Sequence, residues 1–367
     1  MRGLGNIVSR LNAARRTMAA ANANDDGRLD ELSGFGSNPG ELEARIYRPD
    51  SEPSALVVVL HGCTQSASVY DSGSGWSKLA ERHGFALLFP QQRRANNPNL
   101  CFNWYSPGDA RRGRGEAASI AQMVQHLAAE YGLDRSRVFI TGLSAGGAMT
   151  SVMLASYPEL FAAGAIIAGL PFASANTLPE ALERMRGQGF PSRRELHARA
   201  GTAARHAADP PRLAVWHGTR DTIVDPANAT AIVDQWRDLH GLGDAKGQAE
   251  AVAGHRRETW SDAHGRPIVE RYDISGMGHG TPLDTRDDQA CGTAGPHMLE
   301  ANICSTRQIA SSWGLIAEGV SRREPAPAPP DARAVQIASR ATAAPPPQPT
   351  GVGAVIEDAL RAAGLMR

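Results

Sequence analysis

The stretch Val138–Gly147, which reads VFITGLSAGG, gives the clearest indication of how the chain around it folds. Its first residues, Val138–Ile140, form an apolar run that is typical of a buried strand. The glycines around Ser144 then predict a sharp turn, because glycine lets two backbone segments approach closely. Apolar residues continue from the turn to Tyr157 and predict a helix. The stretch therefore predicts a strand and a helix joined by a strained turn that presents Ser144.

The same alternation of strand and helix repeats on both sides of this stretch. Short unbroken apolar runs predict buried strands over Ala55–Leu60, Phe85–Phe89, Ala163–Ala168, Leu213–Trp216 and Ile268–Ile274. Helical spacing of apolar residues predicts helices over Trp76–Arg82 and Glu116–Tyr131. Pro90 is expected to stop the second of these strands. The order of elements predicts an α/β protein with a mostly parallel central sheet and helices on both faces.

One continuous domain accounts for residues 40–320, with residues 171–210 as a small cap inserted over one end of the sheet. Residues 1–39 form an amphipathic or flexible segment, in which arginines interrupt the apolar residues and argue against a secretory signal peptide. Residues 321–350 are rich in proline and alanine and are typical of an extended linker. Residues 351–367 have the spacing of one short helix, which acts either as a docking peptide or as a loose tail.

The charge and hydropathy of the chain exclude several classes of protein. Its 367 residues include 38 Lys and Arg against 38 Asp and Glu, a formal net charge of zero. A nucleic-acid-binding protein needs a basic face for the phosphates, and a transmembrane helix needs about 20 apolar residues in a row. We therefore expect neither a nucleic-acid partner nor integral membrane association. The oligomeric state stays open.

Ser144 is the candidate nucleophile. A serine hydroxyl is weakly nucleophilic at neutral pH, so it needs a histidine as general base and a carboxylate that orients the histidine. On a strand-to-helix turn of this kind, the carboxylate and the histidine follow the serine in that order, at the ends of later strands. Asp221 lies just beyond the strand Leu213–Trp216. Its rival, Asp225, precedes Pro226 and is explained as a helix N-cap, so we predict that Asp221 is the acid.

His279 is the candidate base among eleven histidines. It lies between glycines just past the strand Ile268–Ile274, where its ring can reach over the sheet edge toward Ser144. Other histidines, such as His255, His264 and His297, lack this position at the end of a strand. Two others, which we expect to orient loops, are His61 and His217.

The tetrahedral intermediate of such a reaction also needs hydrogen-bond donors for its oxyanion. One donor is expected to be the amide of Ala145, the residue after the nucleophile. The other is expected in the loop after the first long buried strand, where the amide of Cys63 is favoured over that of Gln65. The chain contains no phosphate-binding loop, and its His and Cys spacings fit no zinc pattern, so we expect no metal and no cofactor.

Five separated motifs resemble the poly(3-hydroxybutyrate) depolymerase family of esterases. They are HGCTQ at 61–65, CFNW at 101–104, GLSAGGAM at 142–149, HGTRD at 217–221 and GMGHG at 276–280. The resemblance implies an α/β-hydrolase fold with Ser144, Asp221 and His279 as the triad. It also implies cofactor-free hydrolysis of ester bonds in short-chain polyhydroxyalkanoates or their oligomers. The family grades into feruloyl and acetyl-xylan esterases, which are the alternative function.

Secreted depolymerases of this family carry a signal peptide and a separate polymer-binding domain, and neither is visible in the sequence. This departure favours soluble oligomers, amorphous polymer or small esters as substrates. Trp104 and Gln65 are candidates to line the substrate site, together with Trp76 and Phe172. Two further hypotheses are a peptidase on the same fold and, from another class, a non-catalytic protein that binds polymer or granule surfaces.

The four cysteines lie in or close to segments that the motifs assign to the active site. Cys63 and Cys101 lie in two of these segments, and Cys291 and Cys304 follow the histidine segment. We predict the disulfides Cys63–Cys101 and Cys291–Cys304. Disulfides persist in oxidising compartments, so the pairing and the resemblance predict an extracellular or periplasmic protein. The lack of a clear signal peptide makes a cytoplasmic location the alternative.

Overall fold

The computed structural model describes residues 27–206, 209–286 and 290–316. The chain divides into two units, residues 1–316 and residues 317–367, and all described residues belong to the first. The expected linker and C-terminal helix, and most of the expected N-terminal segment, lie outside the described residues.

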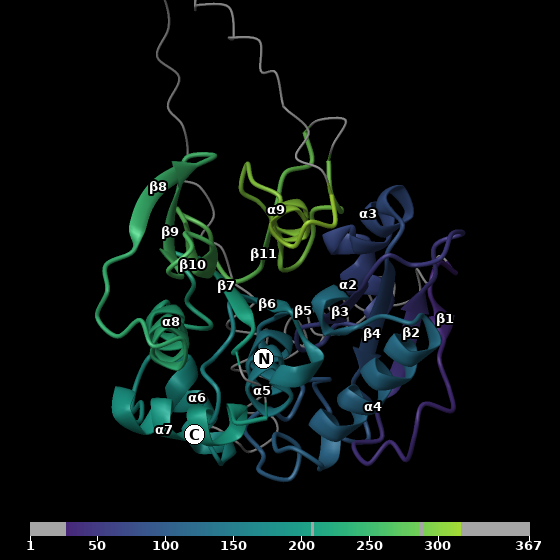
Figure 1. Cartoon of the computed structure of the whole chain (residues 1–367), viewed down its shortest axis with the longest axis horizontal. Coiled ribbons are helices and arrows are strands. Elements are labelled where there is room, and N and C mark those ends of the chain that lie inside the picture. The colour runs from purple at the N-terminus through teal and green to yellow at the C-terminus, as the bar shows by residue number, and fades with distance from the viewer. Residues whose placement is uncertain (1–26, 207–208, 287–289, 317–367) are drawn as a thin grey trace, which may run out of the picture. The chain divides into compact units, whose positions relative to one another are not determined.

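A ten-stranded sheet runs through the described unit (Figure 1). Its strands, in spatial order, are β1 (Asp30–Glu31), β2 (Glu43–Tyr47), β4 (Ala86–Gln91), β3 (Leu56–Leu60), β5 (Val138–Leu143), β6 (Ala163–Ile167), β7 (Arg212–Gly218), β10 (Pro267–Ile274), β9 (His255–Ser261) and β8 (Gln248–Val252). The strands from β4 to β10 in this order are parallel to one another. The two strands at each edge pair antiparallel with their neighbours. This mostly parallel sheet confirms the predicted α/β fold.

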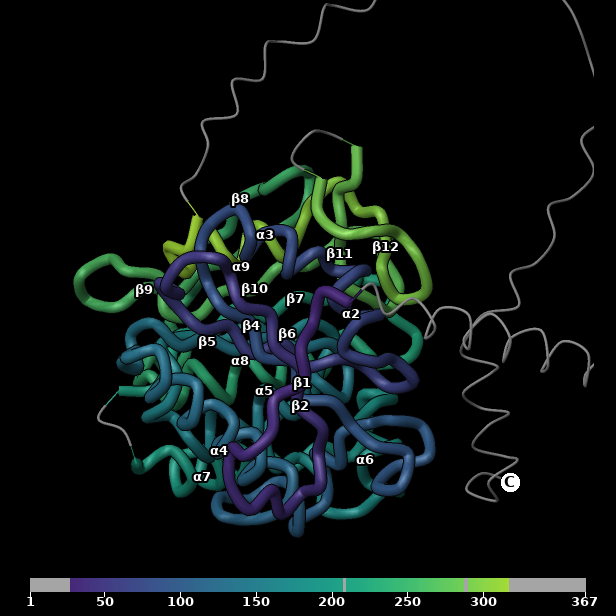
Figure 2. The backbone as a smooth tube through the Cα atoms, turned by 90° about the vertical axis from the view of Figure 1, so that its right-hand side faces the viewer, coloured from purple at the N-terminus to yellow at the C-terminus, as the bar shows by residue number. Residues whose placement is uncertain are grey.

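Helices cover both faces of the sheet because its central strands are apolar on both sides. In β3, Leu56, Val58 and Leu60 belong to one buried cluster, and Val57 and Val59 belong to the other. The first cluster includes residues of α4 (Gly115–Glu130), α5 (Ala145–Ser156), α6 (Leu178–Met185), α7 (Arg193–Ala204) and α8 (Ala227–Leu239). The second includes residues of α2 (Ala67–Ser74), α3 (Trp76–His83) and α9 (Ser305–Ser312). Figure 2 views the sheet from the β1–β2 edge, with these two layers on opposite sides.

A short parallel pair lies apart from the main sheet. Its strands are β11 (Thr281–Leu283) and β12 (Met298–Glu300). Single turns of 3₁₀ helix at Arg135–Arg137 and Pro158–Leu160 precede β5 and β6. The pairing of β11 with β12 matters for the site because β11 begins directly after the segment that carries His279.

The structure differs from the sequence expectation at Pro90, where β4 continues instead of ending. β3 pairs with β4 only as far as Leu88, whereas β2 pairs with β4 through Pro90 to Gln91. Pro90 therefore has a neighbouring strand on one side only. Proline is tolerated at such an edge position, because no ladder partner there requires its missing N–H.

The segment expected to form a cap contains α6 and α7. Ser192 caps α7 with its hydroxyl on the Glu195 amide, while the Glu195 carboxylate accepts from the Ser192 amide. In the described structure α7 packs against α5 and α8, within the layer of helices on that face. Coverage of one end of the sheet by this segment stays a prediction.

Candidate active site

Ser144 lies on the sharp turn between β5 and α5. Its backbone has φ 57° and ψ −118°, a conformation that L-residues rarely adopt. The turn is possible because the glycines beside it leave no side chain in the way. A Cβ on Gly146 would lie 2.4 Å from the Leu60 carbonyl oxygen, and one on Gly142 would lie 2.4 Å from the Gly146 carbonyl oxygen. The predicted strand, turn and helix are thus all present, and the turn presses against the end of β3.

Asp221 and His279 meet because their strands are neighbours. β7 and β10 pair in parallel, so the loops beyond them leave the sheet at the same edge. A Cβ on Gly218 would lie 2.3 Å from the Met277 carbonyl oxygen, so the two loops are in direct backbone contact. His279 Nδ1 lies 2.7 Å from Asp221 Oδ2 and donates to it.

The Asp221 carboxylate is buried, and both of its oxygens accept hydrogen bonds. Its Oδ1 accepts from the amides of Ile223 and Val224, both at 2.9 Å, while its Oδ2 faces His279. Burial alone would raise the pKa of Asp221, but hydrogen bonds from His217 and His279 outweigh burial and hold the pKa well below its usual range. Asp221 is therefore a carboxylate at neutral pH, fixed in position to orient the His279 ring.

His217 is a second histidine on the same carboxylate, which sequence reasoning did not anticipate. Its Nε2 lies 2.8 Å from the Val224 carbonyl oxygen and 3.4 Å from Asp221 Oδ2, so the ring carries its proton on Nε2. The sequence predicts that His217 orients a loop, and its bond to the Val224 carbonyl does hold the Asp221 loop. The sequence signal for this contact was the spacing of four residues between His217 and Asp221 in the HGTRD motif.

Ser144 lies at the same sheet edge as this pair. It follows β5, and in the order β5, β6, β7, β10 one strand separates it from the Asp221 loop and two strands separate it from the His279 loop. Parallel strands end at a common edge, and in open α/β sheets that edge is where ligands bind. The Ser144 amide is itself tied to this neighbourhood, donating to the Ile167 carbonyl at the end of β6 at 2.9 Å.

In the loop after β3, the amide of Cys63 differs from those of Gly62, Thr64 and Gln65 in having no acceptor within the described chain. The Gly62 amide donates to Gln65 Oε1 at 2.9 Å, the Thr64 amide to the Asn99 carbonyl at 2.7 Å, and the Gln65 amide to the Gly62 carbonyl at 3.4 Å. Within the described chain, no hydrogen bond involves the amide of Cys63. The Ala145 amide also lacks an intrahelical acceptor, because it is in the first turn of α5.

Gln65 has a structural task in this loop. Its buried side chain holds the Gly62 amide, so its polar head turns inward to the loop. Trp104, the other expected lining residue, is 6% exposed and contacts Tyr105 edge to face. Phe172 shares the buried cluster of Trp104, whereas Trp76 is buried in the opposite layer, stacked on Trp313. Trp76 thus belongs to the core.

A buried polar network supports the loop from behind. His61 Nε2 accepts from the Gln92 amide at 3.1 Å, while its Nδ1 donates to the Gly62 carbonyl at 2.7 Å. Glu116 accepts from Gln92 Nε2 at 2.6 Å and from the Asn103 amide at 2.8 Å. Burial lowers the pKa of His61 to about 4 and raises that of Glu116 to about 8. The expected role of His61 in orienting its loop matches these contacts.

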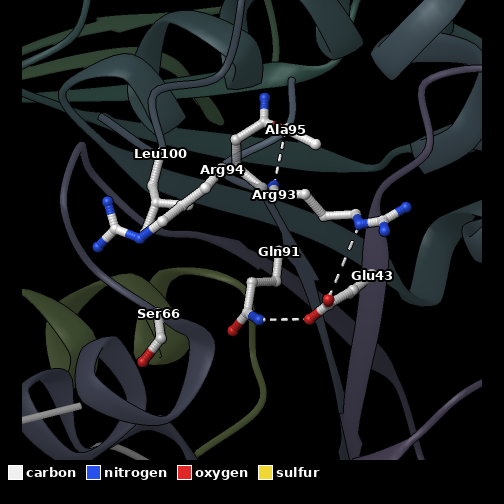
Figure 3. A pocket seen from close by; sticks show the side chains of 8 residues that line it. Glu43, Ser66, Gln91, Arg93, Arg94, Ala95 and Leu100 are labelled. Atoms are coloured by element: carbon white, nitrogen blue, oxygen red, sulfur yellow. Dashed lines mark hydrogen bonds and ion pairs between the residues drawn. The ribbon is translucent and has the colours of Figure 1, made fainter. Parts of the chain in front are cut away.

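A cavity of about 380 Å³ opens beside this loop, at the carboxyl end of β4 (Figure 3). Ser66 and Leu100 line it together with Arg93 and Arg94. Glu43 closes one side, where it accepts a 2.6 Å hydrogen bond from Gln91. The cavity adjoins the Cys63 loop but includes none of the residues Ser144, Asp221 and His279.

Both predicted disulfides are present. Cys63 pairs with Cys101, and Cys291 pairs with Cys304. The first joins the loop after β3 to the loop that carries Trp104, and the second joins the ends of the segment that contains β12.

Neither a metal cluster nor a membrane span emerges from residues 27–206, 209–286 and 290–316. No group of three His, Cys, Asp or Glu side chains in these ranges is arranged to hold a metal ion. Within the same ranges, no helix combines the length and the hydropathy needed to cross a bilayer.

The strand order and the groups at the strand ends define an α/β-hydrolase. Within that class, the chain belongs to the esterase PHB depolymerase family, whose model matches residues 46–261. It is accordingly a carboxylic ester hydrolase, as the resemblance of its motifs implied.

Named relatives of the chain fall into two groups. It is 43% identical over 297 residues to poly(3-hydroxyalkanoate) depolymerase C of Paucimonas lemoignei, covering 78% of this chain and 70% of that protein. It is 32% identical over 267 residues to feruloyl esterase B of Talaromyces funiculosus, covering 70% and 74%. The solved acetyl xylan esterase of Aspergillus awamori aligns with a TM-score of 0.66 at 25% identity, covering 78% of this chain and 99% of that one.

Proposed function

We propose that the protein is a serine esterase that hydrolyses short-chain polyhydroxyalkanoate, in particular poly(3-hydroxybutyrate) or its oligomers, through an acyl-enzyme. The observation that carries the mechanism is the 2.7 Å contact between His279 Nδ1 and Asp221 Oδ2, at the sheet edge where Ser144 sits on its sharp turn. The 43% identity to a poly(3-hydroxyalkanoate) depolymerase supports the substrate class.

In the first half of this mechanism, Ser144 Oγ attacks the ester carbonyl carbon while His279 Nε2 takes the hydroxyl proton. The Asp221 carboxylate stabilises the imidazolium that forms. The amides of Cys63 and Ala145 donate to the oxyanion, and their lack of other partners leaves both N–H groups available. His279 then returns the proton to the departing alcohol as the carbon–oxygen bond breaks.

In the second half, water attacks the acyl-enzyme and gives its proton to His279. The tetrahedral intermediate collapses, the acid product leaves, and the proton passes to Ser144 Oγ. Each half moves one proton out to the imidazole and back, so the enzyme ends as it began.

The substitution Ser144→Ala tests the nucleophile. Turnover of p-nitrophenyl butyrate should fall at least ~10³-fold, the scale of losses when a triad member is removed. Labelling by a fluorophosphonate probe should disappear in the same variant. A variant with near-full turnover would remove Ser144 from the mechanism, and an unlabelled wild-type protein would revive the hypothesis of a non-catalytic polymer-binding protein.

A feruloyl or acetylxylan esterase is the second candidate, supported by relatives at 32% identity and by the TM-score of 0.66 to a solved acetyl xylan esterase. A hydrolysis panel separates the two. It compares hydroxybutyrate oligomers, amorphous polymer, feruloyl esters and acetylated xylan at equal enzyme concentration. The highest kcat/KM on hydroxybutyrate oligomers is expected, and a preference for feruloyl or acetyl esters would replace the first candidate by the second.

The two disulfides support an extracellular or periplasmic location, because such bonds persist in oxidising compartments. The presence of both bonds in protein isolated under thiol-blocking conditions from its native source is the expected result. Four blocked thiols would favour the cytoplasm instead.

A further inference from the structure

His297 lies against the candidate base from a distant part of the sequence. Its Nδ1 lies 3.1 Å from the His279 carbonyl oxygen, to which it donates. Its own carbonyl accepts from the Thr281 amide at 2.8 Å. The two imidazole rings stand nearly perpendicular, with centroids 5.6 Å apart. His297 thus holds the backbone on both sides of Gly280, at the His279 carbonyl and at the Thr281 amide.

The backbone segment that carries His279 packs tightly against the segment that carries His297. A Cβ on Gly280 would lie 2.7 Å from the His297 carbonyl oxygen, so the backbones touch where glycine alone fits. β11 and β12 continue the contact in register, with Thr281 opposite Met298. The position of the His279 turn is therefore coupled to the position of His297.

His297 is in turn held by structure that does not involve the active site. It lies in a tight turn in which the amides and carbonyls of Gly295 and Met298 bond each other at 3.0 Å, and its φ is 62°. The Cys291–Cys304 disulfide closes the segment around this turn. Backbone strain of this kind persists only where surrounding contacts impose it, and the His297 imidazole in this turn lies against that of His279.

We propose that His297 is a positioning residue for His279: its Nδ1–H and its carbonyl fix the turn that aims the His279 ring from Asp221 toward Ser144. The proposal rests on the proposed function, because it assumes that His279 is the base. Burial lowers the pKa of His297, which keeps its ring neutral. A neutral ring adds no positive charge beside a base that must accept a proton.

The test compares two amide substitutions of nearly equal polarity. In His297→Asn the side-chain amide nitrogen replaces Nδ1 and can still donate to the His279 carbonyl. In His297→Gln the nitrogen is one carbon further out and misses that position. We expect His297→Gln to lower kcat on p-nitrophenyl butyrate by about tenfold to 100-fold with KM within about twofold, since small misplacements of a catalytic group cost this much. His297→Asn should keep kcat within about threefold.

Thermal unfolding and a surface control separate positioning from simple destabilisation. Rates are compared per folded molecule, well below the Tm of each variant. His264→Leu, at an exposed turn, should leave kcat and Tm unchanged. Equal kcat in the Asn and Gln variants, whether both high or both low, would overturn the proposal. If His297→Gln does not fold, His297→Ala replaces it with the same expectation.

Ser144→Ala, measured beside these variants, distinguishes the two possible failures. An inactive Ser144→Ala with a fully active His297→Gln refutes the positioning role alone. An active Ser144→Ala refutes the proposed function, and with it the assumption that His279 is a base.

Discussion

At the scale of single residues, Asp221 shows how several contacts define one chemical state. Two backbone amides hold its Oδ1, and two imidazoles face its Oδ2. Because its pKa is lowered on folding, its ionised form contributes stability that is present above the ordinary aspartate value and is lost as the pH falls toward the lowered value. The same contacts that stabilise the charge also fix the tautomer of His279.

The substitution Asp221→Asn should abolish most turnover while leaving the fold intact. The asparagine oxygen can keep the bonds to Ile223 and Val224, but its NH₂ group would face His279 Nδ1 and impose the wrong tautomer. We expect kcat to fall about 10³- to 10⁴-fold. The matched control is Asp225→Asn, an exposed position whose side chain accepts from the Ala227 amide. Loss of activity in the control rather than in Asp221→Asn would reverse the assignment of the acid.

The titration of Glu116 should be visible in how the stability of the protein depends on pH. Burial raises its pKa on folding from 4.5 to about 8, against the pull of three hydrogen bonds from Gln92 and Asn103. Its contribution to stability is therefore complete below about pH 4.5 and is lost as the pH rises toward about 8.

The substitution Glu116→Gln removes that titration. At pH 5 the Glu116 carboxyl is protonated, but its hydroxyl oxygen can still accept a hydrogen bond from Gln92 or Asn103, whereas the NH₂ group of the new amide can only donate, so the variant should be less stable. The Tm advantage of the wild type should then shrink between pH 5 and pH 8, as measured by calorimetry. Glu52→Gln, at an exposed site that forms no ion pair among the described residues, is the control, and its Tm difference from the wild type should not follow this decline. A wild-type advantage that grows with pH would mean that the folded protein prefers the Glu116 anion.

At the scale of elements, the site depends on three close backbone contacts between strand ends. α5 touches the end of β3 at Gly146, the β7 loop touches the β10 loop at Gly218, and the His279 segment touches the β12 segment at Gly280. Each contact joins a loop that carries a functional group to a neighbour that is fixed by the sheet or by a disulfide. Loops on a rigid scaffold are how α/β proteins build their sites.

The substitution Gly146→Ala tests the first of these contacts. Its Cβ would meet the Leu60 and His61 carbonyl oxygens at 2.4 and 2.5 Å, so the turn or the Cys63 loop must shift. We expect a loss of about 1–3 kcal/mol in unfolding free energy and a fall in kcat of about tenfold or more. Gly201→Ala in α7 is the matched control, because nothing lies within 4 Å of its added Cβ. That change should stabilise the protein slightly, and equal effects of the two substitutions would contradict the argument.

At the scale of the whole described unit, two disulfides link segments that carry the site to the rest of the fold. Cys63–Cys101 spans 38 residues and Cys291–Cys304 spans 13. Loop closure in the unfolded chain predicts a stabilisation of roughly 4 and 3 kcal/mol, respectively. The pairs hold the loop of the proposed oxyanion donor and the segment of His297, so their loss should affect activity as well as stability.

Thiol titration of the denatured, unreduced protein is the direct measurement, and no reactive thiol is expected. The paired substitution Cys291→Ser with Cys304→Ser should lower Tm by several degrees, as expected for a loss of about 3 kcal/mol in a chain of this size. Four reactive thiols in the titration, or an unchanged Tm in the double variant, would count against these bonds in the protein.

Local sequence patterns are enough to predict the central part of the fold and the order of the candidate triad. Apolar runs such as Ala55–Leu60 mark strands that are buried on both faces, and this signal is local, so it can be read without tertiary contacts. The positions of Asp221 and His279 just past two such runs were equally readable. The exposed ribbon of β8 and β9 was missed, because strands that face solvent have no apolar run to reveal them.

Contacts between groups that are distant in the sequence depend instead on the folded structure. His217 on Asp221, the network of Glu116 behind the Cys63 loop, and His297 on the His279 turn all depend on neighbours brought together by strand order and packing. The contact between residues 279 and 297 follows from the pairing of β11 with β12. Each of these strands has three residues, which is too short for a sequence pattern to predict. A hydrogen bond between segments requires both partners to be fixed within a few tenths of an ångström, and that precision comes from the packed core rather than from any local pattern.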